Sequence, residues 1–108
     1  MYFYNPVDRG YKEIVAGIRA RTFWGEMIML AVVDLDPNAI LPNHKHPHEQ
    51  AGIVIRGELT MTIADETRGL KQGDVYMIPG NTEHSVIVGT APAQLLDIFT
   101  PVRADMRY

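Results

Sequence analysis

The sequence predicts an all-β protein, built as an antiparallel sandwich or barrel. Two observations favour this fold class. Several short segments are rich in Val, Ile, Thr, Tyr or Phe and are bounded by Gly, Pro, Asn or Asp. No window of a dozen residues carries a clear apolar stripe at helical spacing. With 108 residues the chain can build one hydrophobic core, so we expect a single domain over residues 1–108.

The segment Tyr11–Ala20 is the first expected element along the chain. It is the best candidate for a helix, but Gly17 and the β-branched residues around it favour a strand. In Glu58–Ala64, polar and apolar residues alternate, which is typical of a strand with one face in solvent. The strands expected after the first element are Met27–Leu35, Ala51–Gly57, Glu58–Ala64, Asp74–Gly80, His84–Gly89 and Ala93–Thr100.

Turns separate these strands. Gly57 and Glu58 are expected to turn one strand tightly into the next. The segment Ala64–Gly69 is interpreted as a hairpin loop and Leu70–Asp74 as a second turn, because Gly and Asp are common in turns. Small antiparallel barrels hold ligands in their mouths, so we look there for function.

The composition excludes several classes of protein. The net charge of −3 argues against a nucleic-acid binder, which usually carries a basic excess. No cysteine is present, so disulfides and thiolate ligands are excluded. The longest apolar run, Met27–Val33, is too short to span a membrane, and the first residues do not resemble a signal peptide. We therefore expect a cytoplasmic protein that binds neither membranes nor nucleic acid.

Three of the four histidines lie within the short tract His44–His48. Residues two apart on a strand face the same way, so His44 and His46 can point into one barrel mouth and ligate one cation. Gln50 lies a further even step along the chain and would offer its amide oxygen. His84 begins another expected strand, and its apolar neighbours indicate that it also points inward.

This tract resembles the first motif of the cupins, a family of small β-barrels of the jelly-roll kind. The motif, G-x5-H-x-H-x3,4-E-x6-G, is matched in spacing from His44 through Gln50 to Gly57, with Gln50 where many cupins have Glu. The opening Gly is expected at Ala39 or nearby and is absent, so Pro37–Asn38 is expected to make that turn. The resemblance implies a jelly-roll barrel that holds a divalent metal ion.

A second cupin motif, G-x5-P-x-G-x2-H-x3-N, is matched by Gly73, Pro79 and His84. Asn81 stands where the motif has its second Gly, and Asn tolerates the left-handed backbone that such a turn needs. Val88 replaces the final Asn of the motif. The two motifs together make the resemblance cover most of the chain, about residues 27–99.

The stretches HPHEQ and DIFTPVR are similar to a narrower group, the small single-domain cupins of pectin and alginate breakdown known as the KdgF type. This group is associated with linearising 4,5-unsaturated uronates to open-chain keto-uronates. The residues of this chain that match its metal ligands are His44, His46, Gln50 and His84, and those that match its catalytic side chains are Asp97, Phe99 and Arg103. The resemblance implies a mechanism in which the metal holds vicinal oxygens of a small anionic substrate, Asp97 moves a proton and Arg103 binds the carboxylate.

The implied ligand set carries no charge. Three neutral imidazoles and one amide leave a divalent ion with its full positive charge, which makes it a strong Lewis acid and stabilises a higher iron oxidation state less well. We therefore favour a metal-dependent isomerase or lyase-like enzyme that opens the ring of a sugar acid. The same ligands suit Ni, Zn, Mn, Fe or Co, so the metal stays open.

Several alternatives stay open at this level. The protein could instead be a metal-dependent oxygenase of the same fold, or a module that binds a small ligand without turnover. Asp97 could be a core carboxylate bound to a turn, and Arg103 could pair with Asp105 or Glu13 on the surface. His48 follows a proline and is placed at the rim of the site or behind the ligands.

The N-terminal segment MYFY is apolar and aromatic. Cupins usually pair their barrels edge to edge, and such a segment could cover the sheet of a partner. The resemblance therefore implies a homodimer.

Overall fold

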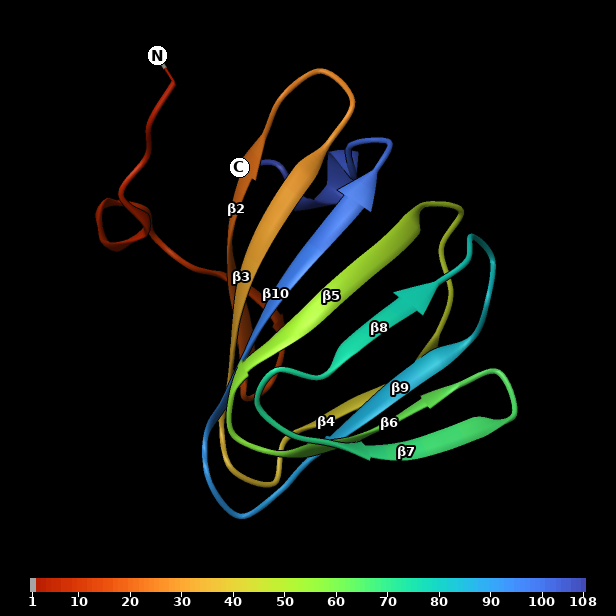
Figure 1. Cartoon of the computed structure of the whole chain (residues 1–108). Coiled ribbons are helices and arrows are strands. Elements are labelled where there is room, and N and C mark those ends of the chain that lie inside the picture. Colours follow the sequence, from red (N-terminus) through yellow and green to blue (C-terminus); the bar gives the residue numbers. More distant parts are fainter. Residues whose placement is uncertain (1) are drawn as a thin grey trace.

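The computed structural model describes residues 2–108, which form two antiparallel β-sheets that face each other (Figure 1). The expectation of an all-β antiparallel jelly-roll is confirmed. Two short 3-10 turns, η1 (Pro6–Asp8) and η2 (Ala104–Met106), lie near the two ends of the described chain. The strands are β1 (Lys12–Val15), β2 (Ile18–Trp24), β3 (Met29–Leu35), β4 (Ile40–His44), β5 (Glu49–Arg56), β6 (Leu59–Ile63), β7 (Glu66–Leu70), β8 (Val75–Ile78), β9 (His84–Val88) and β10 (Ala93–Thr100).

One sheet has six strands in the order β1-β2-β3-β10-β5-β8, and the other has four in the order β4-β9-β6-β7. The chain changes sheet at every connection from β3 to β6 and again from β7 to β10. This repeated crossing brings segments far apart in sequence to the same end of the two sheets (Figure 1). No helix within residues 2–108 is long and apolar enough to cross a membrane.

The core lies between the sheets, because alternate residues of each strand point inward. In β10 every second position from Ala93 to Phe99 is buried, and one of these inward positions is Asp97. Fully burying a large aliphatic side chain contributes about 1.5–3 kcal/mol. The largest fully buried apolar side chains are Ile18, Met29, Val54 and Ile78.

The strands expected after Tyr11–Ala20 are all present, with ends shifted by at most two residues. Tyr11–Ala20 itself contains β1 and the start of β2, joined at Gly17, so the preference for strand over helix is confirmed. Gly17 has a φ of +82°, which glycine adopts without steric cost. The second expected turn, Leu70–Asp74, separates β7 from β8.

Several features differ from the sequence expectation, and one is strand β4, which is not among the expected strands. The hairpin loop expected over Ala64–Gly69 is only a two-residue turn, because β7 begins at Glu66 and pairs with β6. Four of the five β7 residues are exposed, so this edge strand lacks the apolar alternation that reveals a strand. Gly57 does not close a hairpin either, since β5 and β6 lie in different sheets and the glycine carries the crossing between them.

Two asparagines shape the loops that lead to the histidines. Asn38 and Asn81 both have a φ of +61°, so each makes the left-handed turn expected of it. The turn ahead of the first motif is therefore centred on Asn38 rather than on Ala39. The Asn81 backbone N–H donates to the carbonyl of His46 at 2.7 Å, which ties the β8–β9 loop to the β4–β5 loop.

Candidate metal centre

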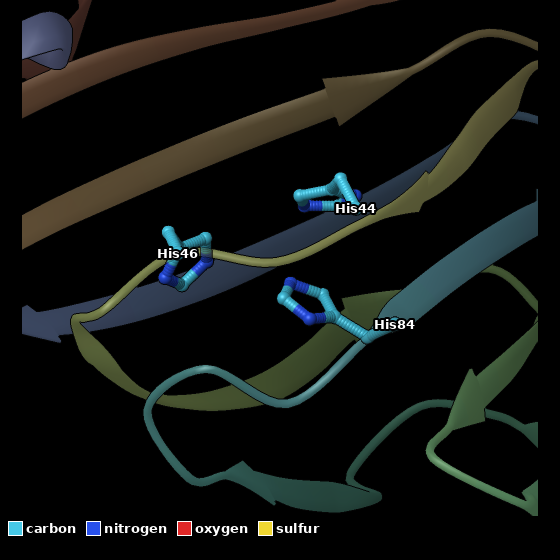
Figure 2. Close-up of side chains that lie close together, drawn as sticks. All are labelled: His44, His46 and His84. Carbon is cyan, nitrogen blue, oxygen red and sulfur yellow. The ribbon is translucent and has the colours of Figure 1, made fainter.

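Three imidazole rings from two distant segments converge at one end of the sheets (Figure 2). His44 ends β4, His46 lies in the loop that follows, and His84 begins β9. One ring nitrogen from each of the three lies within 4.8 Å of the corresponding nitrogens of the others. Three nitrogen donors at this spacing can face a single divalent ion. The structure therefore brings together the three histidines that the sequence singled out.

Main-chain contacts hold these segments side by side. His44 and His84 are directly opposite each other in the β4–β9 pairing, and their ring centroids are 4.1 Å apart. Beside them, Gly80 approaches Pro47 so closely that an added Cβ would lie 2.4 Å from the Pro47 carbonyl oxygen. Strand parity does not align His46 with His44, because β4 ends at His44 and a loop carries His46 to the site.

A backbone carbonyl orients each of the three rings. The Nδ1 atoms of His44, His46 and His84 lie 2.9, 3.1 and 2.8 Å from the carbonyl oxygens of Pro42, His48 and Thr82, respectively. A carbonyl only accepts hydrogen bonds, so each Nδ1 carries the proton and each Nε2 presents a lone pair. This is the arrangement typical of metal-bound histidine, in which the second ring nitrogen is held by an outer hydrogen bond.

Gln50 places its side-chain oxygen against the same cluster. Its Oε1 lies 3.1 Å from His46 Nε2, and its amide hydrogen-bonds to the Asp97 carboxylate. With Nδ1 of His46 protonated, an amide oxygen and an imidazole lone pair face each other, and two acceptors repel unless a cation lies between them. His84 Nε2 is also buried without a hydrogen-bond partner in the described chain. These donors therefore fit a divalent metal ion, and the Gln50 side-chain oxygen lies beside the histidine cluster.

Burial keeps two of the rings neutral. Burial lowers the pKa of His84 to about 4, and repulsion from the Arg103 charge, and from His44 and His46 whenever they are protonated, adds to the effect. Burial also lowers the pKa of His46, and Arg103 contributes. The hydrogen bond from His84 to the Thr82 carbonyl opposes the first shift, and the one that Gln50 would accept from a protonated His46 opposes the second, without reversing either. Neutral imidazoles are the form that binds metal.

The cluster opens onto a cavity of about 460 Å³ between the two sheets. Pockets of 300–1,000 Å³ with apolar walls and a few convergent polar groups are typical small-molecule sites. Aliphatic side chains such as Ile18, Val33 and Leu95 form the inner wall. The polar side chains predicted for the site that line the cavity are His44, Gln50, His84, Asp97 and Arg103.

Asp97 is a buried carboxyl group on the cavity wall, with only 6% of the residue exposed. The Tyr76 hydroxyl donates to its Oδ1 at 2.5 Å. Burial raises the pKa of Asp97 to about 6, although the hydrogen bonds from Tyr76 and Gln50 and the charge of Arg103 oppose the rise. The alternative of a carboxylate bound to a turn is not observed, because its partner is a side chain on β8.

Phe99 and Arg103 complete the side of the cavity next to the histidines. Phe99 is 3% exposed and meets the His46 ring edge-on, with centroids 5.8 Å apart. The Arg103 guanidinium lies 5.0 Å from the centre of the Phe99 ring and pairs with Asp105 through Nη2 at 2.9 Å. Arg103 is therefore both a cavity residue and a partner of Asp105, whereas no ion pair joins it to Glu13.

Two further residues near the site behave differently from the ligands. The His48 ring lies 5.6 Å from that of His46 and is not among the three converging imidazoles, which agrees with a place at the rim. Tyr76 is not among the site residues predicted from the sequence, yet its hydroxyl contacts Asp97. Nothing in the sequence around Tyr76 indicates this contact, because the two residues meet only through the pairing of the strands.

Comparisons with known proteins agree with this geometry. Residues 31–99 match the protein family described as the Cupin domain. Over 106 residues the chain is 35% identical to the pectin degradation protein KdgF of Dickeya dadantii (strain 3937), covering 96% of each. It is similar to the structure of KdgF from Halomonas sp., with a TM-score of 0.91, 26% identity and 99% of each chain covered. An RmlC-like cupin from Shewanella frigidimarina shares the fold at 23% identity, with a TM-score of 0.92 and 99% and 96% coverage of this chain and that one.

Proposed function

This chain belongs to the cupin domain family and resembles KdgF over nearly its whole length, and from that premise we propose that it opens the ring of an unsaturated uronate with the help of a bound metal ion. The observation that carries the proposal is one cavity whose wall includes His44 and His84 of the donor cluster, a buried carboxyl and a guanidinium. The name of the Dickeya relative refers to pectin degradation, which supports a sugar acid as the substrate.

The residues that would hold the ion are His44, His46, Gln50 and His84. When bound there, a divalent transition metal supplies a Lewis acid that polarises oxygen atoms of the substrate. The uncharged ligands favour this use over oxygenase chemistry, since they leave the positive charge of the ion uncompensated. Ni, Zn, Mn, Fe and Co all fit such donors.

In this proposal, Arg103 binds the substrate carboxylate. Its guanidinium lies at the cavity wall, with 17% of its side chain exposed, and is held in place by Asp105 and the Phe99 ring. A guanidinium can bind a carboxylate through two parallel N–H groups, which fixes the orientation as well as the charge. Bound in this way, a uronate would direct its sugar ring toward Asp97 and the donor cluster.

In this proposal, Asp97 moves a proton. In the proposed reaction, it takes the proton of the anomeric hydroxyl, the bond from the anomeric carbon to the ring oxygen breaks, and the anomeric carbon becomes a carbonyl. The electron pair of that bond stays on the former ring oxygen as an enolate. Asp97 then returns the proton to the alkene carbon that does not carry this oxygen. The carbon that carries the oxygen becomes a ketone. Atoms and electrons balance, because the product is an isomer of the substrate.

The proposal is tested with metal-loaded protein and unsaturated galacturonate or guluronate monomers as substrates. Elemental analysis gives the metal, and proton NMR follows loss of the alkene signal and growth of the keto product. We expect turnover in the wild type, with Asp97→Asn lowering kcat by about 10²–10⁴-fold. Unchanged turnover in Asp97→Asn would remove its assigned role.

Further measurements on the same metal-loaded protein distinguish two rival functions. Oxygen uptake by the iron-loaded protein, in step with substrate loss, would indicate an oxygenase. Tight binding of the uronate by calorimetry with no chemical change would indicate a binding module. Neither outcome is compatible with the ring-opening proposal.

We also propose that the protein is a cytoplasmic homodimer. The aromatic side chains of Tyr2 and Phe3 are 92% and 90% exposed, and the N-terminal arm extends away from the sheets (Figure 1). Exposed aromatic groups of this kind favour burial against another protein surface. Size-exclusion chromatography with light scattering tests this, and a clean monomer at micromolar concentration would contradict it.

A further inference from the structure

Three neighbouring strands place Tyr76, Gly52 and Asp97 in one row across the six-stranded sheet. Gly52 on β5 pairs with Tyr76 on β8 on one side and with Asp97 on β10 on the other. All three are buried. Because Gly52 has no side chain, the Tyr76 ring can lie over β5 and bring its hydroxyl to Asp97.

The fit at this crossing is close. A Cβ built on Gly52 would lie 2.2 Å from the ring Cζ of Tyr76 and 2.3 Å from its hydroxyl oxygen. Real Cβ atoms essentially never approach other atoms to this extent, so any side chain at position 52 would push the ring away. The backbone of Gly52 has no positive φ, so the glycine is required here for space rather than for its conformation.

We propose that Tyr76 is a positioning residue for Asp97, reaching over the gap at Gly52 to fix the carboxylate that carries the proton. This inference rests on the proposed function, since it concerns the group that would act on the substrate. The hydroxyl holds Oδ1 at 2.5 Å, and the Gln50 amide binds the same carboxylate. With its orientation set from two sides, the carboxylate can offer its remaining lone pairs to the cavity.

A purely structural role is the competing explanation. A buried carboxylate needs hydrogen bonds, and a tyrosine could supply one without any effect on the chemistry. The two roles predict different kinetics. Loss of positioning lowers kcat per folded, metal-loaded molecule and leaves KM nearly unchanged, whereas loss of structure lowers the concentration of folded protein and leaves kcat per folded molecule as in the wild type. Circular dichroism and metal stoichiometry give the folded, loaded fraction by which kcat is divided.

The kinetic test compares Tyr76→Phe with a matched control, Tyr11→Phe. Tyr11 also donates to a carboxylate, Asp34 Oδ2 at 2.6 Å, but it does not line the cavity. We expect Tyr76→Phe to lower kcat by about 10- to 100-fold with KM changed by less than about threefold. Tyr11→Phe should leave kcat as in the wild type. A kcat for Tyr76→Phe within twofold of wild type overturns the inference.

A second pair of variants tests whether Tyr76 needs the absence of a side chain at position 52. Gly52→Ala should displace the Tyr76 ring and lower kcat at least as much as Tyr76→Phe does. Gly69→Ala is the control, because Gly69 also lies in a strand and has open space around it. If Gly52→Ala fails to fold, the Tyr76→Phe kinetics and a proton NMR measurement on the wild type and Tyr76→Phe decide instead. A folded Gly52→Ala protein with wild-type kcat overturns the inference.

Proton NMR provides a measurement that needs no substrate. The buried Tyr76 hydroxyl should give a slowly exchanging low-field resonance that is absent in Tyr76→Phe and displaced in Asp97→Asn. A wild-type spectrum without this resonance overturns the inference even where uronate turnover is found. Absence of turnover in the loaded wild type contradicts the proposed function instead, and the resonance then still reports whether Tyr76 holds Asp97.

Discussion

At the scale of single residues, Gln50 decides the charge of the proposed metal centre. Its oxygen faces His46 Nε2 at 3.1 Å, in a position where a carboxylate ligand would halve the net charge of a divalent ion. The same side chain hydrogen-bonds to Asp97, so it links the donor cluster to the group proposed to move the proton. A change at this one position therefore tests both parts of the site.

Gln50→Glu should bind divalent metal more tightly, on the order of tenfold, because an anion replaces a neutral donor beside the cation. Turnover should fall, because the compensated ion polarises the substrate less. Competition with a chromophoric chelator measures the affinity. Glu49→Gln is the control, since Glu49 is the exposed neighbour on the same strand. Equal metal affinity in Gln50→Glu and wild type would contradict a ligand role for Gln50.

Arg103→Ala should raise KM for the uronate on the order of 10- to 100-fold, because a hydrogen bond to a charged group contributes about 1.5–3 kcal/mol. The kcat should change less, since Asp97 stays in place. Steady-state kinetics gives both constants. Arg68→Ala, on the exposed edge strand β7, is the control and should match the wild type. A KM that stays constant in Arg103→Ala would place the substrate carboxylate elsewhere in the cavity.

The residues of the site differ in how readily the sequence reveals them. His44, His46 and His84 follow from motif spacing, because a metal site needs fixed ligand types at fixed intervals. Tyr76 does not, since its contact with Asp97 depends on an empty position in the strand between them. A glycine inside a strand pattern, as at Gly52, is the one local sign that another group comes close.

At the scale of elements, the crossing between β5 and β6 depends on Gly57. Its φ of +83° is a left-handed conformation, and an added Cβ would lie 2.5 Å from the Pro92 carbonyl oxygen. Gly73 has a similar φ of +91° but open space around it. A substitution at Gly73 therefore introduces conformational strain alone, whereas one at Gly57 introduces both strain and steric overlap.

Gly73→Ala should lower the free energy of unfolding by about 1–2 kcal/mol, the cost of a left-handed alanine. Gly57→Ala should lower it further, because the backbone of the β9–β10 connection must also shift. Urea unfolding followed by circular dichroism measures both values. Equal losses in the two variants would show that Pro92 moves aside freely.

The elements also show which strands a sequence can reveal. Strands with one face in the core, such as β6 and β10, carry an alternation that fixes their position within two residues. The edge strand β7 buries only Leu70, so its sequence pattern resembles that of a polar loop. Strand β4, which ends at His44, shows no such alternation, because most of its residues are exposed.

At the scale of the whole molecule, the proposed ligands join the two sheets. His44 and His84 belong to the four-stranded sheet and Gln50 belongs to the six-stranded one. An ion that binds only the folded arrangement stabilises it by mass action, by about 2.7 kcal/mol at a hundredfold excess over its dissociation constant.

Adding Zn²⁺ or Ni²⁺ at that excess should raise the melting temperature by roughly 10 °C. A chelator should reverse the increase, and His84→Ala should nearly abolish it. Differential scanning calorimetry with and without metal makes the measurement on each protein. An equal increase in His84→Ala would mean that the ion binds somewhere other than the histidine cluster.

The hydrogen bond from Asn81 to the His46 carbonyl has one more consequence. It is made by the main chain, so the β4–β5 and β8–β9 loops beside the proposed ligands stay joined whether or not an ion is present. Capture of the ion then requires no refolding, and crystals of the stripped and loaded protein should superimpose at this rim. A rigid mouth of this kind selects among ions by their radius, because its donor atoms cannot move apart to accommodate a larger ion.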